Sequence, residues 1–475
     1  MFAYSSIEQY HAQLQEGQVD CVRAVQHYTA RIRETASLNA FIEVYEAEAL
    51  DRARQLDAKR QTGAPMGKLH GVVIALKDVI CYKDHKVSAA SGILENFTSI
   101  YSATAVERLL QEDAIIIGNC NCDEFAMGST NENSSYGPVR NAADPERVPG
   151  GSSGGSAVAV QSGCCMVSLG TDTGGSVRQP ADFCGIIGMK PTYGRISRYG
   201  VIAYASSFDQ IGIFGNNIPD VAHVLQVIAG ADEFDSTLSQ KPVEDYHALL
   251  QDGKKYRFAW LREALEHPSL DPAIASAIKE KIESLRKEGH TVEPVEFDML
   301  EYIVPAYYIL TTAEASSNLS RYDGVRFGHR TRQPGLDLTE FYKQNRAEGF
   351  GKEVKRRIML GTFVLSAGYY DAYFTRAQKV RNLIRQRTEQ IFAQYDFILL
   401  PTSPSTAFKI GEKTKDPIEM YLADIYTVMA NLAGIPAIAL PLFKHPNGLP
   451  FGLQVMANRF QELPLLEVSA QLMRR

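Results

Sequence analysis

A stretch dense in glycine and serine, residues 128–217, is the feature that most constrains how this chain folds. The same stretch carries apolar runs such as SAVAV (156–160) and CGIIG (184–188). A flexible linker of glycine and serine is polar throughout and has no core. The interleaved apolar residues instead indicate that the glycines make tight turns and close backbone approaches. We therefore expect this stretch to be part of a packed core.

The composition is that of an ordinary globular protein of 475 residues, with 45% hydrophobic and 22% charged residues. A chain of this length can bury a large core without disulfides or bound metals. These values exclude disordered, collagen-like and disulfide-scaffold proteins. Because 49 Lys and Arg residues stand against 55 Asp and Glu residues, the net charge is −6. A large nucleic-acid surface needs clustered excess Lys and Arg, so we do not expect one here.

The cysteines favour a reducing compartment, because their number, 7, is odd and their spacing matches no disulfide framework. No second Cys or His pair follows Cys120 and Cys122 at zinc-finger spacing, so we interpret both as buried apolar residues and predict no metal site. The segment MFAYSSIEQYHAQLQ lacks the basic and apolar regions of a signal peptide. No apolar run approaches the ~20 residues of a membrane span. These features predict a cytoplasmic protein.

The apolar pattern of the N-terminal quarter predicts helices followed by a parallel crossover. Apolar residues recur three or four positions apart, so we expect the first ~60 residues to be helical. The apolar runs 71–76 and 114–118 have the length of strands, and a helical segment at 103–112 lies between them. The order strand, helix, strand is typical of two parallel strands in one sheet.

In the second half, residues 271–289 carry the start and stop signals of a helix. Asp271 is placed to cap it, Pro272 occupies its first position and Gly289 ends it. The other expected elements are strands at 255–261 and 291–297, a strand running into a loop at 397–405, a helix at ~366–393, an exposed polar excursion at 320–352 and a candidate subdomain junction at 231–254.

Two glycine-serine clusters, 150–156 and 170–176, are the densest candidates for chemistry. Neither contains the Gly-Lys-Ser/Thr ending of a phosphate loop or a clean dinucleotide fingerprint. Residues 151–155 match G-x-S-x-G, the nucleophile elbow of α/β-hydrolases, but that mechanism needs a catalytic His after the Ser. No later His is visibly presented on a loop after a strand, so we interpret this match as a coincidence of a short motif.

Lys77 is the alternative base, because it ends the apolar run 72–76 and is expected at the edge of the core. Burial lowers the pKa of a lysine, since it disfavours the charged form. A neutral amine can then accept a proton. The competing interpretation is an ion pair with Asp78, which is the commoner arrangement when only the local sequence is considered.

Residues 150–197, GGSSGGSAVAVQSGCCMVSLGTDTGGSVRQPADFCGIIGMKPTYGRIS, closely resemble the signature of the amidase signature family, and HGVVIALKDVI (70–80) resembles its lysine segment. The resemblance extends over essentially the whole chain. It implies an α/β fold with a mixed β-sheet core covered by α-helices on both sides. It also implies a single domain, residues 1–475, with N-terminal helices at 1–60, the catalytic core at 61–230 and the remainder, with substrate-binding helices, at 255–475.

The same resemblance implies a Ser–cis-Ser–Lys triad. Ser176 is then the nucleophile, Ser152 the bridging serine on a cis peptide bond, and Lys77 the base. Ser153 is expected only to hold the loop. The backbone at Thr173, Gly174 and Gly175 is expected to direct N–H groups at the oxyanion of the tetrahedral intermediate.

Three further segments, 123–141, 348–374 and 408–441, are similar to the glutamine-hydrolysing subunits of tRNA-dependent amidotransferases. This similarity implies that Arg357, or its neighbour Arg356, binds the α-carboxylate of glutamine. It implies that Asp424 binds the α-amino group. Tyr308 or Tyr307 is expected near the glutamine, with core packing as the alternative for either ring.

The function that follows is hydrolysis of glutamine to release ammonia, which a partner uses to convert Glu-tRNA(Gln) to Gln-tRNA(Gln). The implied partners are the B and C subunits of such an amidotransferase, with tRNA contacted mainly through the B subunit. No cofactor is expected on this chain, and ATP and Mg²⁺ are expected on a partner. No membrane association is expected. The alternative is a free-standing amidase of the same fold that acts on small or aryl amides.

Overall fold

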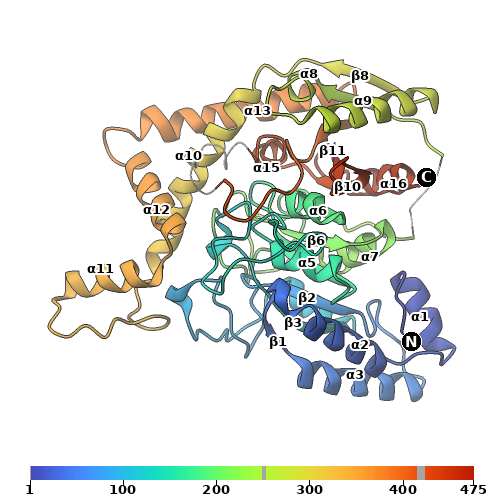
Figure 1. Cartoon of the computed structure of the whole chain (residues 1–475), viewed down its shortest axis with the longest axis horizontal. Helices are drawn as coiled ribbons and strands as arrows, with labels where there is room; N and C mark the ends of the chain where they lie inside the picture. Colours follow the sequence, from blue (N-terminus) through green and yellow to red (C-terminus); the bar gives the residue numbers. More distant parts are fainter. Residues whose placement is uncertain (1, 249–252, 414–422, 475) are drawn as a thin grey trace.

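A mixed sheet of eleven strands forms the centre of the fold in the part of the chain that the computed structural model describes, residues 2–248, 253–413 and 423–474 (Figure 1). Its strand order is β1 (Phe41–Val44), β3 (Ile115–Cys120), β2 (Val73–Lys77), β4 (Val167–Thr171), β6 (Ile211–Gly215), β5 (Ile187–Lys190), β10 (Ala437–Lys444), β11 (Pro450–Ala457), β9 (Phe397–Pro401), β7 (Arg257–Leu261) and β8 (Thr291–Val295). Strands β2, β3 and β4 are mutually parallel, as are β7, β8 and β9. The other neighbouring pairs are antiparallel.

Helices cover this sheet on both sides, so the expected α/β fold with a mixed sheet core is confirmed. The helices are α1 (Ile7–Gln15), α2 (Cys21–Glu34), α3 (Glu46–Gln61), α4 (Thr104–Gln111), α5 (Gly154–Gln161), α6 (Arg178–Cys184), α7 (Ile218–Ile228), α8 (Arg262–Leu265), α9 (Pro272–Lys287), α10 (Leu300–Asn318), α11 (Leu338–Gly349), α12 (Lys352–Val364), α13 (Arg376–Phe392), α15 (Val428–Ala433) and α16 (Glu462–Met473). Short 3-10 turns occur at Ala36–Leu38, Gly92–Leu94, Glu124–Ala126 and Leu319–Arg321.

The crossover expected in the N-terminal quarter is confirmed. Strand β2 is followed by α4 and then by β3, which lies parallel to β2 with Val73 opposite Ile115. The expectation that the first ~60 residues are only helical needs a correction, because β1 lies between α2 and α3 and pairs antiparallel with β3. This strand has four residues, too few for a period of two to stand out from helical neighbours.

Helix α9 begins at Pro272 with the Asp271 side chain accepting from the Ala273 and Ile274 N–H groups, as its start signals predict. The strands expected at 255–261, 291–297 and 397–405 correspond to β7, β8 and β9. The helix expected from ~366 begins later: a π-turn over Asp371–Thr375 leads into α13. The polar excursion contains α11, and residues 249–252 of the candidate junction lie outside the described residues.

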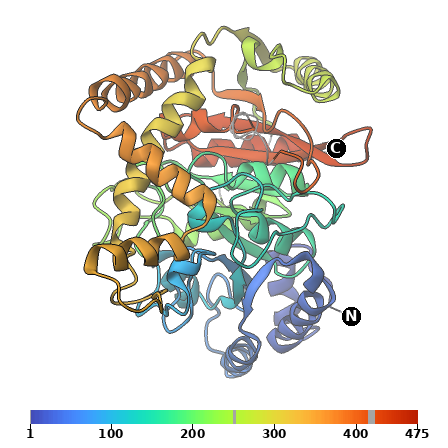
Figure 2. The same ribbon diagram turned by 60° about the vertical axis from the view of Figure 1, so that its left-hand side comes forward.

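Helices α10, α12 and α13 form a layer at one side of the molecule. Figure 2, which brings this side forward, shows α10 and α12 lying side by side, and the two helices are in contact. Apolar and small residues of α10 face the protein interior, including Tyr307 and Tyr308, which are 4% and 6% exposed. This layer carries candidate substrate-binding residues, and α10 and α13 contact α15, which follows Asp424 in the chain.

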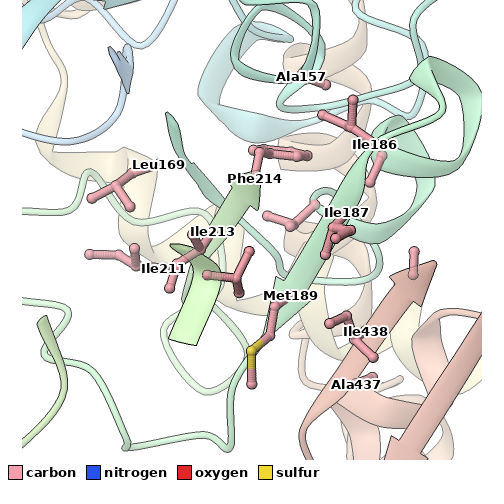
Figure 3. Packing of buried hydrophobic residues seen from close by; sticks show 14 of the residues in the cluster. Ala157, Leu169, Ile186, Ile187, Met189, Ile211, Ile213, Phe214, Ala437 and Ile438 are labelled. Carbon is pink, nitrogen blue, oxygen red and sulfur yellow. The ribbon is translucent and has the colours of Figure 1, made fainter. Parts of the chain in front are cut away.

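The glycine-serine stretch is part of the core, as its apolar runs predict. Ala157 of α5 and Leu169 of β4 pack with Ile187 of β5 and Ile213 and Phe214 of β6 (Figure 3). An added Cβ on Gly170 would collide with Phe214 and Ser153, so this strand tolerates only glycine there. The glycines therefore bring α5 and the strands into close contact.

All 7 cysteines are buried and none is in a disulfide. Among the described helices, none is both long enough and apolar enough to cross a bilayer.

Candidate active site

The candidate site forms where two parallel strands end next to each other. Lys77 is the last residue of β2 and Thr171 the last residue of β4. Because β2 and β4 are neighbours, with Leu76 opposite Leu169, their carboxyl ends meet at one edge of the sheet. The loop before α5, which contains Ser152 and Ser153, crosses this edge. The turn 172–177 leaves β4 at the same place.

Lys77 is fully buried among hydroxyl groups. Its Nζ donates to the Oγ of Ser152 at 2.6 Å. It also donates to the Oγ of Ser153 and the Oγ1 of Thr171, both at 2.9 Å. Burial lowers the pKa of Lys77 to about 8. The position therefore favours a lysine that gives up its proton near neutral pH.

The ion pair between Lys77 and Asp78 is not formed. The Asp78 carboxylate instead accepts from the backbone N–H groups of Ser88 and Ala90, at 3.0 and 2.7 Å. The Asn119 amide also donates to it, at 2.5 Å. Successive side chains of an extended strand point to opposite faces, so adjacent residues at its end diverge. Geometry thus separates the two interpretations that the local sequence left open.

The loop at Ser152 is held by Asp123. The Gly151–Ser152 peptide bond is cis, and the Ser152 carbonyl accepts from the Asp123 N–H at 3.0 Å. The Asp123 carboxylate accepts from the N–H groups of Asn131 and Asn133, at 2.8 and 3.0 Å. A Cβ on Gly151 would collide with this carboxylate, so the close approach requires glycine.

Ser176 lies beside this loop, because its carbonyl accepts from the Ser153 N–H at 3.3 Å. It is 9% exposed. Within the described ranges its Oγ forms no hydrogen bond. The structure thus contains the Lys77–Ser152 contact of the expected triad, and the Ser152–Ser176 hydrogen bond is not formed in it.

In the turn before Ser176, one backbone N–H group is bonded to Asp172 and others are available to a ligand. The Gly175 N–H donates to Asp172 Oδ1 at 2.9 Å, so Gly175 does not have the free oxyanion donor that the sequence predicts. The N–H groups of Thr173, Gly174 and Ser176 donate to no group in the part of the chain that the structure describes. These three are the available oxyanion donors of the turn.

A buried ion pair between Arg178 and Asp172 stabilises this turn. Arg178 donates to both carboxylate oxygens of Asp172, from Nε at 3.1 Å and Nη2 at 2.9 Å. Burial alone raises the pKa of Asp172, but the Arg178 charge and hydrogen bonds outweigh it and hold the pKa at about 2. Asp172 is therefore a permanent anion that organises the turn.

Two predicted glutamine-binding residues from distant segments, Arg357 and Asp424, both contact a third, Tyr308. The Tyr308 hydroxyl on α10 donates to Asp424 Oδ2 at 3.0 Å. The Arg357 guanidinium on α12 lies 5.3 Å from the centre of the Tyr308 ring. Ser129 Oγ also donates to Asp424, at 3.0 Å. The ring of Tyr308 thus contacts the Arg357 guanidinium, and its hydroxyl contacts the Asp424 carboxylate.

The structure separates the two neighbours that the sequence could not. Both arginines form an ion pair with Glu353, but Arg357 is 4% exposed, whereas the Arg356 side chain is 40% exposed. Tyr308 contacts Asp424, whereas Tyr307 packs against Gly174, where any Cβ would collide with its ring. Tyr307 therefore forms a wall of the turn, and Arg357 and Tyr308 are the members that face the Asp424 carboxylate.

Asp424 is buried, and burial raises its pKa to about 6 against the opposing effects of Ser129, Tyr308 and Arg357. Thr427 connects this segment to the turn, since its Oγ1 donates to the Gly174 carbonyl at 2.6 Å. We call Arg357, Tyr308 and Asp424 the clamp. The clamp and the Ser176 turn are therefore parts of one site. No group of three or more His, Cys, Asp and Glu within the described ranges is arranged to hold a metal ion.

Most of the chain matches one known family, since residues 23–466 fit the family model described as Amidase. The chain belongs to this family. The amidase match includes the signature at 150–197, the lysine segment and the clamp residues Arg357, Tyr308 and Asp424.

Two curated amidase relatives are each named as the A subunit of glutamyl-tRNA(Gln) amidotransferase. The protein of Chlorobium luteolum is 50% identical over 472 residues, covering 99% of this chain and 97% of the relative. The protein of Koribacter versatilis is 48% identical, covering 96% and 95%. A solved structure of that name from Thermotoga maritima is 40% identical with a TM-score of 0.78, covering 94% of this chain and 90% of its own.

Several residues of the amidase site carried no sequence signal on their own. Thr171 binds Lys77, Ser129 binds Asp424 and Thr427 binds the Gly174 carbonyl. A lone Ser or Thr is too common to stand out, although Ser129 lies in the segment 123–141 whose similarity was noted. Tyr204 was also missed, and its hydroxyl accepts from Arg357 Nη1 at 2.9 Å.

Proposed function

We propose that this amidase is the glutamine-hydrolysing subunit of a tRNA-dependent amidotransferase. The observation that carries the proposal is the clamp formed by Arg357, Tyr308 and Asp424 beside the Ser176 turn. A buried guanidinium and a buried carboxylate are complementary to the α-carboxylate and α-ammonium groups of a free amino acid. A small or aryl amide carries neither charge, so the clamp favours glutamine over the substrates of a free-standing amidase.

The first half of the reaction forms an ester. Neutral Lys77 takes the proton of Ser152, and Ser152 takes the proton of Ser176 as the Ser176 oxygen attacks the side-chain carbonyl of glutamine. The N–H groups of Thr173, Gly174 and Ser176 stabilise the oxyanion that forms. The proton returns through the same groups to the leaving nitrogen. The carbon–nitrogen bond then breaks and ammonia departs.

The second half restores the enzyme. Water attacks the γ-glutamyl ester on Ser176, and its proton passes to Ser152 and Lys77. The ester bond breaks, Ser176 recovers its proton and glutamate leaves. The Ser152–Ser176 contact that this relay requires forms in the complex with glutamine, since catalytic hydrogen bonds often tighten only when substrate is bound.

The released ammonia is the product that a partner consumes. We propose the B and C subunits of the amidotransferase as the partners, with ATP, Mg²⁺ and most tRNA contacts on the B subunit, and a cytoplasmic location for the complex. Glu-tRNA(Gln) is then converted to Gln-tRNA(Gln) on that partner. The acidic balance of this chain, net charge −6, is consistent with tRNA being bound mainly elsewhere.

The decisive experiment compares glutamine with an uncharged amide in wild type and in Asp424→Asn. We expect glutamine to be hydrolysed and simple aryl or aliphatic amides to react poorly. Because a charge-assisted hydrogen bond contributes about 1.5–3 kcal/mol, Asp424→Asn is expected to raise the KM for glutamine about tenfold or more. Ser176 should still react with a generic acylating probe. Copurified partners should increase the glutaminase rate of the chain.

A control variant distinguishes loss of glutamine recognition from general damage to the fold. Tyr246→Phe, which removes a buried tyrosine hydroxyl bonded to Arg195 outside the site, should leave the glutamine KM unchanged. Brisk hydrolysis of aryl amides by the isolated chain, with glutamine ignored even when partners are present, would move the protein to the free-standing amidase interpretation.

A further inference from the structure

Three arginines surround a surface hollow that shares no lining residue with the candidate active site. The hollow has a volume of about 310 Å³. Arg381 and Arg385 come from α13, and Arg459 follows β11. The amides of Gln378 and Asn382 complete its polar wall, and among the described residues no Asp or Glu lines it. We call these five residues the arginine pocket.

Arg381 is held rigidly at the base of the arginine pocket. Its Nε donates to the Leu432 carbonyl at 3.1 Å, and its Nη2 donates to the Ser207 carbonyl at 3.0 Å. Its Nη1 donates to Ser207 Oγ at 3.3 Å, and the Phe208 ring lies 4.1 Å below the guanidinium. These bonds use three of the five N–H groups of an arginine and leave two for a ligand. A guanidinium fixed in this way loses little entropy on binding.

The other two arginines are at the mouth of the pocket. The Arg385 side chain is 45% exposed, donates to Asn382 Oδ1 at 3.1 Å and lies 3.7 Å from Glu389, a loose ion pair. Arg459 is exposed and lies 5.7 Å from the centre of the Phe460 ring. Three like charges around one hollow repel one another, and an anion between them removes this repulsion. The charge of the pocket therefore favours an anionic ligand.

We propose that the arginine pocket binds a phosphate group. Guanidinium forks match the oxygens of phosphate in pairs. Several forks around one volume present more donors than the two oxygens of a carboxylate can use, whereas a tetrahedral phosphate presents oxygens in several directions. The phosphate group comes either from free inorganic phosphate or from the backbone of an RNA. Both sources present the same phosphate oxygens to the arginines, and the experiment distinguishes them.

The test uses the full chain and two probes, inorganic phosphate and a tRNA transcript. The pocket variant is Arg385→Gln with Arg459→Gln, which removes two exposed charges and keeps the half-buried Arg381. The matched control is Arg376→Gln with Lys379→Gln, which removes two exposed charges from the same helix outside the pocket. Calorimetric titration is done at fixed ionic strength with chloride as the balancing anion. General charge screening is then equal for all variants.

We expect the wild type and the control to bind equally, and the pocket variant to bind at least tenfold more weakly. A loss confined to inorganic phosphate identifies the free ion as the ligand. A loss confined to the transcript identifies an RNA backbone phosphate. Equal binding of both probes by the pocket variant and the control, or no binding of either probe by the wild type, overturns the proposal. Equal melting temperatures of the variants confirm that both are folded.

Discussion

At the scale of single residues, burial lowers the pKa of Lys77 and so favours its neutral form. Its ammonium contacts hydroxyl groups of Ser152, Ser153 and Thr171 and, among the described residues, forms no ion pair. A carboxylate partner would stabilise the charged form and raise the pKa, whereas desolvation without a partner lowers it. The divergence of Asp78 toward Ser88 and Ala90 therefore helps to keep the pKa of Lys77 low, as the proposed role of base requires.

The pKa of Lys77 predicts the pH dependence of glutamine hydrolysis. Burial lowers that pKa from 10.5 to about 8, so the neutral, active form is a minority at pH 7 and increases as pH rises. We expect kcat to rise roughly tenfold between pH 7 and a plateau above pH 9, with a midpoint near 8. Stopped-time glutaminase assays from pH 6 to 10 measure this profile. A flat profile would contradict the assignment, and Lys77→Arg should be inactive throughout because guanidinium stays charged.

Ser176 and Ser153, whose backbones are hydrogen bonded to each other, predict different losses of activity. Ser176→Ala removes the nucleophile and is expected to lower kcat by about three orders of magnitude or more. Ser153 Oγ accepts from Lys77 and donates to the Thr171 carbonyl at 3.1 Å, so Ser153→Ala should weaken activity and loosen the loop without abolishing the reaction. Single-turnover assays and thermal melting distinguish these effects. Full activity of Ser176→Ala, or complete loss on replacing any single histidine, would refute the triad.

At the scale of elements, the loop between β5 and β6 joins the clamp to the oxyanion turn. The Tyr204 hydroxyl accepts from Arg357 at 2.9 Å, and the Tyr204 N–H donates to Asp209 Oδ2 at 2.9 Å. Thr173 Oγ1 donates to the other oxygen of Asp209 at 2.7 Å. One loop therefore sets the position of Arg357 on α12 and of Thr173 after β4. Neither helix nor strand alone determines their separation.

This loop predicts an effect on glutamine binding. Tyr204→Phe keeps the ring against Arg357 but removes the hydroxyl, so the guanidinium loses one acceptor while its ion pair with Glu353 remains. A lost hydrogen bond to a charged group corresponds to about 1.5–3 kcal/mol, and solvent replaces part of it. We expect the KM for glutamine to rise about five- to tenfold with kcat changed less than twofold, measured by steady-state kinetics.

Tyr246→Phe is the matched control for this prediction, because the Tyr246 hydroxyl also accepts from a buried arginine, Arg195, at 2.7 Å. It should leave both constants at their wild-type values. A kcat loss in Tyr204→Phe with an unchanged KM would assign Tyr204 to the chemical step and not to positioning of Arg357.

At the scale of the whole molecule, Arg178 connects the signature stretch to the C-terminal part of the chain. Besides Asp172, its guanidinium donates to the Thr427 carbonyl at 2.7 Å and to Gln454 Oε1 at 2.5 Å. Asn431 Oδ1 accepts from it at 2.6 Å. Residues from α6, the start of α15 and β11 therefore share one buried cation. This arrangement brings the Ser176 turn and the Asp424 segment together.

Removing that cation predicts a large loss of stability. Arg178→Met leaves Asp172 as a buried anion without a counter-ion, which costs about 3–5 kcal/mol of the free energy of unfolding. Chemical denaturation measures this change. Adding Asp172→Asn to the same chain should recover part of the loss, since the uncompensated charge is gone. Arg54→Met, which breaks an exposed pair with Asp51, should change stability by no more than about 0.5 kcal/mol.

Local sequence patterns were sufficient wherever the signal lies within one element or a few consecutive elements. The caps of α9 are adjacent to it, the crossover from β2 to β3 is carried by three consecutive segments, and the apolar runs inside the glycine-serine stretch predicted its place in the core. The four-residue strand β1 was missed because its pairing with β3, and not its own pattern, makes it a strand.

By itself the sequence determined the family resemblance and the α/β class, and it predicted the residues of the triad and clamp, because these are carried by contiguous motifs. The tertiary structure alone decided that Lys77 is free of Asp78, that Arg357 and Tyr308 rather than Arg356 and Tyr307 face Asp424, and that the Gly175 N–H belongs to Asp172. The physical reason is that burial and hydrogen-bond partners arise between segments far apart in the chain. Neighbouring residues of the same type become different only when the fold buries one and exposes the other.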